Sequence, residues 1–205
     1  MFYDILDGKR RQVLPLLKNF KADFYLAGGT GLALQLGHRD SIDFDFFSPK
    51  AIDTVALYKK IKEIFTGHKI EKVQEEKDTL TVFIDDGIKM SFFSYDYELI
   101  GKVVNEENLN IASIIDIACM KLSAIVSRAT NKDYVDLYFI LQNLPLGEIL
   151  PFLSRKFPDM DVNLALKSLV YFKDVKKEPI KFKHQKNIDF ASVKSFLEKQ
   201  AKNYS

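Results

Sequence analysis

Residues 28–47 read GGTGLALQLGHRDSIDFDFF, and two signals are joined in them. Gly28 and Gly29 follow a short apolar run, residues 23–27, which is typical of a buried strand. Because glycine has no Cβ atom, the pair permits a tight turn and lets a ligand approach the backbone. Thr30 can cap the helix that follows, and the first N–H groups of that helix favour an anion such as a phosphate.

The second signal is a pair of acids one residue apart in a hydrophobic strand, residues 42–47. Side chains alternate between the two faces of a strand, so Asp43 and Asp45 share one face, and Ser41 lies on the same alternation. The two carboxylates repel each other unless a cation lies between them. Mg²⁺ fits because it takes oxygen ligands and leaves positions open for phosphates, and Mn²⁺ is a second candidate. The alternative is a solvated edge strand with a polar face.

The composition indicates a globular protein with an ordinary core. The chain has 205 residues, 47% of them hydrophobic, which is enough for one sizeable domain or for a core domain with a small helical one. The net charge of +2 is too small to require a nucleic-acid partner. No apolar run reaches the roughly 20 residues of a membrane helix, and the N-terminus lacks the features of a signal peptide. With Cys119 as its single cysteine, the protein is expected to be cytoplasmic, without membrane contact.

Hydrophobic periodicity predicts strands mixed with helices and then, from about residue 95, helices alone. The sequence Asp85-Asp86-Gly87 indicates a hairpin between the last two strands. We therefore expect an α+β fold: a mixed β-sheet core with flanking helices at residues 1–96, and a mainly helical region at residues 97–205 that packs on the core and completes the cleft. The predicted strands are residues 23–27, 42–47, 69–75, 79–84 and 88–94, and the predicted helices are residues 9–20, 30–37, 50–65, 111–128 and 131–142.

One cation interrupts the apolar helix predicted at residues 111–128. Lys121 shares a stripe of that helix with Arg128, and burying an ammonium group without a partner is expensive. Lys121 therefore either reaches solvent from the edge of the apolar face or points into the cleft toward a triphosphate. Asp133 and Asp136 lie one turn apart on the next helix and share a face. The simplest interpretation makes them a helix-terminal acid and a surface acid.

These features resemble the nucleotidyltransferase superfamily of the DNA polymerase β type, and within it the AbiEii/AbiGii toxin-like nucleotidyltransferases. The resemblance spans roughly residues 20–142 and rests on two blocks. The blocks are Gly28-Gly29-Thr30 with Arg39-x-Ser41-x-Asp43-x-Asp45-Phe46, and Lys121-Leu122-Ser123-Ala124 with Lys132-Asp133-Tyr134-Val135-Asp136-Leu137.

The resemblance implies a nucleotidyltransferase-type fold and a Mg²⁺-dependent enzyme that moves NMP from an NTP to an acceptor, either an RNA such as a tRNA end or a protein hydroxyl. It also implies a toxin–antitoxin pair, with a cognate antitoxin as partner. Asp136 would orient Arg39 or act as a base toward the incoming hydroxyl, and Asp133 is a further candidate for the site. The implied catalytic residues are Asp43, Asp45, Lys121 and Asp136, the first two as metal ligands. The implied nucleotide contacts are Gly28, Gly29, Thr30, Arg39, Ser41 and Lys121.

One departure from the family pattern counts against a complete site. A third carboxylate usually follows on a later strand, here predicted at residues 88–94, and the expected position is Ser91 or Lys89 on the same face. Neither is an acid, and Asp85 lies in the turn. In the superfamily this carboxylate normally ligates the metal that activates the attacking hydroxyl. The alternative function is therefore a catalytically silent relative that binds nucleotide or a partner protein.

Other polar features have ordinary explanations. His38 is expected in a solvent-facing loop, and His68 and His184 lack partners at the spacing of zinc ligands. Cys119 is expected to be a small buried core residue rather than a nucleophile. Residues 173–186 carry six lysines with interleaved apolar residues, which indicates either a solvated linker or a surface that follows an RNA backbone.

Overall fold

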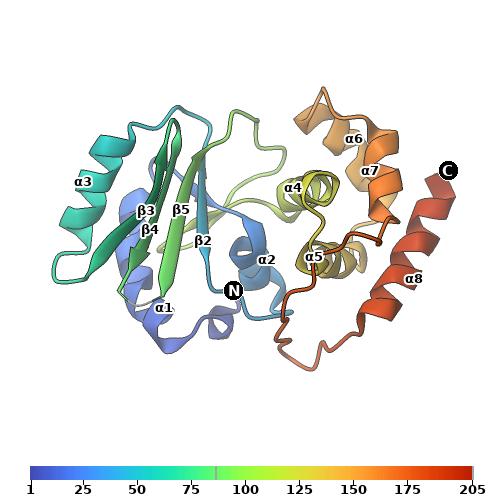
Figure 1. Ribbon diagram of the computed structural model, residues 1–205, viewed down its shortest axis with the longest axis horizontal. Helices are drawn as coiled ribbons and strands as arrows, with labels where there is room; N and C mark the ends of the chain where they lie inside the picture. The colour runs from blue at the N-terminus through green and yellow to red at the C-terminus, as the bar shows by residue number, and fades with distance from the viewer. Residues whose placement is uncertain (86, 205) are drawn as a thin grey trace.

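The computed structural model describes residues 1–85 and 87–204, and a mixed sheet forms the N-terminal half of that part of the chain (Figure 1). The strands are β1 (Tyr25–Leu26), β2 (Phe44–Ser48), β3 (Ile70–Glu76), β4 (Thr79–Ile84), β5 (Ile88–Ser94), β6 (Val104–Asn105) and β7 (Asn110–Ile111). Their order in the sheet is β3-β4-β5-β2-β1-β7-β6. β2 is parallel to β5, β1 is parallel to β7, and the other neighbours are antiparallel.

Helices flank the sheet and make up most of the C-terminal part. In Figure 1, α3 covers the outer side of the sheet, α2 lies between the sheet and the helical part, and α4 to α8 pack together at the right. The helices are α1 (Gly8–Val13), α2 (Gly28–Leu36), α3 (Thr54–Ile64), α4 (Ile114–Ser127), α5 (Asn131–Leu141), α6 (Leu146–Lys156), α7 (Val162–Leu169) and α8 (Phe190–Ala201), with 3₁₀ helices at Tyr3–Ile5, Leu14–Phe20 and Lys202–Tyr204. None of the described helices is long and apolar enough to cross a membrane.

The α+β fold is confirmed, and the differences from the predicted elements have local causes. The helix predicted at residues 9–20 is α-helical only to Val13 and continues as a 3₁₀ helix, because Pro15 has no N–H for an α-helical bond. The helix predicted from residue 111 begins at Ile114, where Ser113 caps it. The residues just before it form β7, so the expectation of helices alone after residue 95 was wrong.

Two hydrophobic clusters divide the molecule. The first holds buried residues from Ile5 to Ile111 and lies within the sheet and its N-terminal helices. The second runs mainly from Ala112 to Ala201 and joins α4 to α8, with Tyr25, Ala27 and Leu32 as its contacts on the sheet side. The predicted division between residues 96 and 97 falls between β5 and β6, and it stays a prediction.

The strand β2 has the alternation that the sequence predicts. Phe44 and Phe46 are fully buried in the first cluster, and the ring of Phe46 stacks on Phe92 of the neighbouring β5 at 5.0 Å. Burying each aromatic ring contributes about 2 kcal/mol, which fixes the register of β2 because a slip of one residue would expose both rings. The packing on this face therefore turns Asp45 to the opposite face, toward the helical part.

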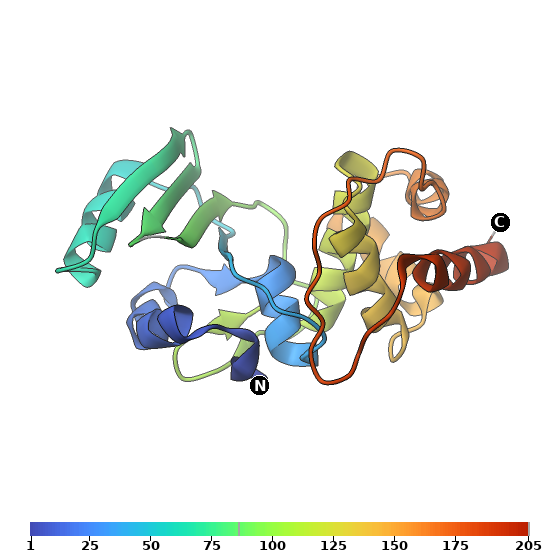
Figure 2. The same cartoon turned by 60° about the horizontal axis from the view of Figure 1, so that its bottom comes forward.

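Residues 173–186, here called the crossing segment, return from the helical part to the sheet part. Figure 2 shows the segment as an extended orange-to-red trace beside the blue connection that follows α2. Backbone bonds join Lys176 to Ala129 at 3.0 Å, and Lys181 to Asp40 at 2.8 Å. The segment is therefore pinned at both ends to different parts of the molecule, and none of its residues is buried, so it is a solvated connection with a fixed path.

Candidate active site

The turn between β1 and α2 brings two glycines against the acidic strand. Gly28 has a φ of +62°, and a Cβ atom on it would lie 2.9 Å from Oδ2 of Asp45. A Cβ atom on Gly29 would lie 2.7 Å from Nη2 of Arg39. Both approaches are too close for a side chain, so the start of α2 presents bare backbone at this place. The helix begins at Gly28, and the prediction that Thr30 caps it was therefore wrong.

Thr30 is buried, and its hydroxyl group is used inside the protein. Its Oγ1 donates to the backbone oxygen of Asp43 and lies 2.8 Å from Oγ of Ser41. Because β2 starts at Phe44, Ser41 and Asp43 belong to the segment that leads into the strand. Thr30 thus holds the acidic segment from behind, while Ser41, Asp43 and Asp45 face a cavity.

This cavity has a volume of about 580 Å³ and lies between the sheet and the helices α4 and α5. Its lining brings together most of the site residues named from the sequence: Gly29, Arg39, Ser41, Asp43, Asp45, Lys121 and Asp133. The lining holds six further charged residues to which the sequence analysis gave no role in the site: Asp40, Lys89, Arg128, Lys132, Glu178 and Lys181. Only the type of side chain could have indicated them. We call it the charged cavity.

Among the described residues, Asp43 and Asp45 form no ion pair, and the charges of Lys89, Lys121 and Arg128 only partly offset the burial of Asp45. Burial raises the pKa of Asp45 above its usual value, and the nearby charge of Asp43 raises it further. The described residues contain no group of three or more His, Cys, Asp or Glu side chains that could hold a metal ion. A pair of carboxylates that shares its ion with substrate phosphates is an arrangement that Mg²⁺ accepts, so the donor set fits this ion.

The residue beside Asp45 on the neighbouring strand is Ser91. The two residues are register partners in the parallel pairing of β2 with β5. Ser91 is buried, with its hydroxyl 3.4 Å from that of Thr81, and Lys89 lines the same cavity. The position where the sequence analysis expected a third carboxylate is thus adjacent to Asp45, and it carries a hydroxyl group.

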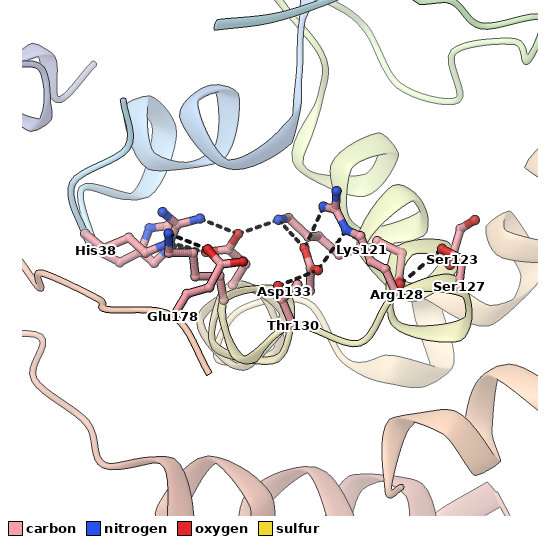
Figure 3. Close-up of polar contacts among 12 residues, drawn as sticks. His38, Lys121, Ser123, Ser127, Arg128, Thr130, Asp133 and Glu178 are labelled. Atoms are coloured by element: carbon pink, nitrogen blue, oxygen red, sulfur yellow. Dashed lines mark hydrogen bonds and ion pairs between the residues drawn. The ribbon is translucent and has the colours of Figure 1, made fainter. Parts of the chain in front are cut away.

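Asp136 lies at the centre of a buried ionic network beside this cavity. Figure 3 shows this network between the labelled residues His38 and Arg128. It accepts bonds from Nε and Nη2 of Arg39 at 2.7 and 2.8 Å, and Nζ of Lys121 lies 2.6 Å from its Oδ2. Burial alone would raise the pKa of Asp136, but these cations and His38 outweigh it and hold the pKa well below its usual value. With its oxygens used in this way and no exposed surface, Asp136 orients Arg39 and does not face an incoming hydroxyl.

Lys121 is buried and paired, so it does not extend to solvent. Its Nζ lies 2.8 Å from Oδ1 of Asp133, in addition to the contact with Asp136. Asp133 also accepts bonds from Thr130 at 2.8 Å and from Arg128 at 3.2 Å. Asp133 lies in the first turn of α5, as the simplest interpretation expected, whereas the interpretation of Asp136 as a surface acid was wrong. Both carboxylates are buried and hold the cations in place.

His38 belongs to the same network, and the expectation of a solvent-facing loop residue was wrong. It is fully buried, with Nε2 2.7 Å from Oδ1 of Asp136, and its ring packs against Phe139 at 5.0 Å. Burial, together with the charges of Arg39 and Lys121, lowers the pKa of His38 despite the opposing effect of Asp136. The neutral ring then carries its proton on Nε2 and donates it to Asp136.

Arg128 is the cation of the network that remains accessible. Its side chain is 64% exposed, whereas Arg39 is almost fully buried against Asp136. Arg128 lines the charged cavity beside Lys121 and Asp45. A cation held at one end by Asp133 and open to solvent at the other can contact an anionic ligand without leaving a buried carboxylate unpaired.

The remaining titratable residues do not form a second site among the described residues. Cys119 is buried, which raises the pKa of its thiol to about 12, as expected for a core residue rather than a nucleophile. His68 pairs with Asp85, and His184 pairs with Asp4. Neither pair has the further ligands that a zinc ion needs.

Comparisons with known proteins agree with this fold. The sequence model of the family described as "Nucleotidyl transferase AbiEii toxin, Type IV TA system" matches residues 16–192. A protein of Aquifex aeolicus (strain VF5), described as uncharacterized protein aq_aa25, is 40% identical over 162 residues, which are 76% of this chain and 77% of that protein. The family match extends about fifty residues beyond the two blocks on which the resemblance rests.

Solved structures share the fold at low sequence identity. JHP933 from Helicobacter pylori has a TM-score of 0.58 and 21% identity, and the alignment covers 97% of this chain and 92% of JHP933. MenT4, a nucleotidyltransferase toxin from Mycobacterium tuberculosis H37Rv, has a TM-score of 0.61 and 14% identity, over 94% and 80% of the two chains. The Megavirus polyadenylate synthase has a TM-score of 0.51 and 17% identity, over 66% of this chain and 31% of the synthase.

The mixed sheet with its flanking helices has the fold of solved nucleotidyltransferase structures. The family match covers most of the chain. The chain belongs to the AbiEii nucleotidyltransferase toxin family, and it is an enzyme of the nucleotidyltransferase class.

Proposed function

We propose that the protein transfers NMP from an NTP to an acceptor hydroxyl with Mg²⁺ as cofactor. The acceptor oxygen bonds to the α-phosphorus, the bond from this phosphorus to the bridging oxygen breaks, pyrophosphate leaves with the electron pair, and the hydroxyl proton passes to solvent. The observation that carries the proposal is the pair Asp43 and Asp45 in one cavity with Lys121 and with the backbone of Gly29. Mn²⁺ is the natural substitute ion.

The metal would be held by Asp43 and Asp45, whose mutual repulsion it would relieve. When bound, Mg²⁺ supplies Lewis-acid stabilisation of the phosphoryl oxygens. The N-terminus of α2 at Gly28 and Gly29 offers backbone N–H groups for phosphate oxygens, and Ser41 adds a hydroxyl group at the cavity wall.

The cations divide into two kinds. Lys121 and Arg128 line the cavity and would neutralise charge that develops on the leaving pyrophosphate. Arg39 donates most of its bonds inward, to Asp136 and to the backbone oxygen of Asp40. Asp136 would therefore act as a positioning residue that holds Arg39 and Lys121 at the edge of the cavity, and Asp133 would do the same for Lys121 and Arg128.

The charge around the cavity favours an RNA acceptor, such as a tRNA end, over a protein hydroxyl. Lys89, Lys132 and Lys181 line the cavity in addition to the three cations of the network. Lys181 belongs to the crossing segment and pairs with Asp40 at 3.2 Å, but its side chain is 80% exposed, so it can also meet a phosphate backbone. We further propose that the protein acts in the cytoplasm as the toxin of a toxin–antitoxin pair, with a cognate antitoxin as its partner, as the family description supports.

A labelling experiment tests this function. The purified protein is incubated with Mg²⁺, total tRNA, cell lysate and each of the four NTPs labelled on the α-phosphate. We expect label in tRNA, dependent on Mg²⁺, and no label when the γ-phosphate carries it. If only a protein band carried label, the acceptor would be a protein and not an RNA. If neither tRNA nor protein carried label, the result would contradict the transfer reaction.

A second candidate function is supported by Ser91. Because the partner of Asp45 on β5 carries no charge, the site has one carboxylate fewer than the family pattern expects. A catalytically silent protein that binds nucleotide or a partner protein would be consistent with this. Tight MgNTP binding without transfer in the labelling experiment would favour the second candidate.

Replacing Lys121 by alanine is expected to lower the transfer rate by about 10²-fold or more at saturating NTP, because one preorganised charge is lost from the cavity. Transfer is measured per folded molecule, since Asp133 and Asp136 also lose a partner. The matched control is Lys156→Ala: Lys156 is equally buried and bonds Asp116 at 2.9 Å, but it does not line the charged cavity. Both variants should lose stability, and only Lys121→Ala should lose activity. If the transfer rate of Lys121→Ala were within about threefold of the parent rate, Lys121 would have no role in the transfer reaction.

A further inference from the structure

A second cavity of about 400 Å³ adjoins the charged cavity. The two share four lining residues, Asp45, Phe93, Lys121 and Arg128, so they meet at one carboxylate, one aromatic ring and two cations. Every other residue in the lining of the second cavity is uncharged: Gly28, Phe47, Ser94, Tyr95, Ile117, Met120, Ser123, Ala124 and Ser127. We call it the aromatic cavity. The charged cavity on one side of the shared residues is therefore lined by many charged side chains, whereas the rest of the aromatic cavity on the other side has none.

A chain of aromatic rings forms one wall of this cavity. Phe47 lies 5.3 Å from Phe93 and 5.3 Å from Tyr95, measured between ring centroids, and Tyr95 lies 4.9 Å from Tyr97. The rings of Tyr25 and Phe157 support the chain from behind. The aromatic wall is thus held in position before any ligand arrives, which is the condition for stacking with little loss of conformational entropy.

The opposite wall is a face of α4. Met120 offers a polarisable thioether, and Ser123 and Ser127 offer hydroxyl groups. Figure 3 shows both serines beyond Arg128, on the side away from His38. Oγ of Ser127 is bonded to backbone oxygens of α4, whereas Oγ of Ser123 has no hydrogen-bond partner among the residues that the structure describes.

From this division of charge we infer that the aromatic cavity is the subsite for the base of the donor nucleotide, which stacks against Phe93 and Tyr95 and faces Met120 and Ser123. The inference rests on the proposed function, because it takes the triphosphate to lie at the shared junction. From there the uncharged base enters the aromatic cavity, and the charged cavity with Lys89 and Lys181 remains for the acceptor. A nucleobase has the flat, uncharged surface that such a wall accommodates, whereas a polyanionic acceptor matches the lysines.

The test fills the aromatic cavity without touching the junction. In Ser123→Phe a ring replaces the small side chain on the cavity side of α4. We expect its Kd for MgNTP, measured by calorimetry, to rise about tenfold or more, since stacking on an aromatic wall contributes about 1–3 kcal/mol per base. Its Kd for inorganic tripolyphosphate with Mg²⁺ should stay within about twofold of the parent value. The matched control is Ser154→Phe, the same change at an exposed position of α6, which should alter neither Kd.

The outcomes separate the subsite from the function. If Ser123→Phe binds MgNTP as well as the parent but transfers slowly, the aromatic cavity holds the acceptor and the inference fails. It also fails if the parent binds tripolyphosphate as tightly as MgNTP, since no base contact would then contribute. If the parent binds neither ligand, the proposed function itself fails. Loss of both ligands in the variant alone would overturn the inference, because the cavity would then not be separate from the phosphate site.

Discussion

Replacing Asp43 and Asp45 together by asparagine is expected to abolish Mg²⁺-dependent NTP binding and to lower transfer by about 10³-fold or more, because both proposed metal ligands are lost. The fold should remain intact. Burial and Asp43 raise the pKa of Asp45, so the charged form of Asp45 opposes folding at neutral pH, and the uncharged amide removes that opposition. The thermal midpoint of the double variant should therefore equal or exceed that of the parent.

Asp85→Asn is the control for this experiment. Asp85 is a carboxylate of the β4–β5 turn that bonds His68 and the backbone of Lys69, and it does not line the charged cavity. Its replacement should leave MgNTP binding unchanged. A double variant that bound MgNTP as tightly as the parent would show that Asp43 and Asp45 do not hold the metal.

Replacing Asp136 by asparagine is expected to destabilise the protein by about 3–5 kcal/mol, because the buried cations Arg39 and Lys121 lose their shared counter-charge. The loss of unfolding free energy caused by Asp136→Asn should become smaller as the pH is lowered. The folded pKa of Asp136 lies well below its usual value, so its contribution is complete above the unfolded pKa of about 3.9 and declines as pH falls toward the folded pKa. Denaturant unfolding of parent and variant between pH 8 and pH 3 measures this difference.

The control for Asp136 is Asp40→Asn. Asp40 pairs with Lys181 and Lys183 at 3.2 Å near the surface, so its loss should cost at most about 1 kcal/mol. A loss of similar size for Asp136→Asn would mean that the buried network does not depend on this carboxylate. A difference that grew as the pH fell toward 3 would also contradict the assignment.

The sequence predicted the elements whose hydrophobic pattern is long and regular. β4 and β5 have the predicted bounds, because an alternating run on each side of a turn fixes both ends. β6 and β7 were missed because two-residue strands are too short to show a period, and their place depends on the pairing of β7 with β1 and of β6 with β7. The start of α2 was placed two residues late, since the fit between Gly28 and Asp45 can be seen only in three dimensions.

For the site, the sequence named most lining residues but not how they are connected. Asp133 and Asp136 have the spacing of one helical turn, and nothing in that spacing shows that four basic side chains, His38, Arg39, Lys121 and Arg128, converge on them. The resemblance implied that Arg39 contacts the nucleotide and that Asp136 orients Arg39 or acts as a base, and in the structure Asp136 bonds the guanidinium group. His38 and Arg39 are almost a hundred residues from Asp136 in the chain, and local sequence patterns do not indicate contacts at that separation.

The crossing segment gives the molecule a second link between its two parts, in addition to the covalent one between β7 and α4. On the helical side Lys176 bonds the backbone of Ala129 and Asn131, and on the sheet side Lys181 and Lys183 bond the backbone of Asp40 and His38. These backbone bonds lie beside the charged cavity. They therefore fix the distance between the sheet wall and the helical wall of the cavity when the chain folds. The entropy of bringing the two walls together is lost once, during folding, and not again each time that a nucleotide binds.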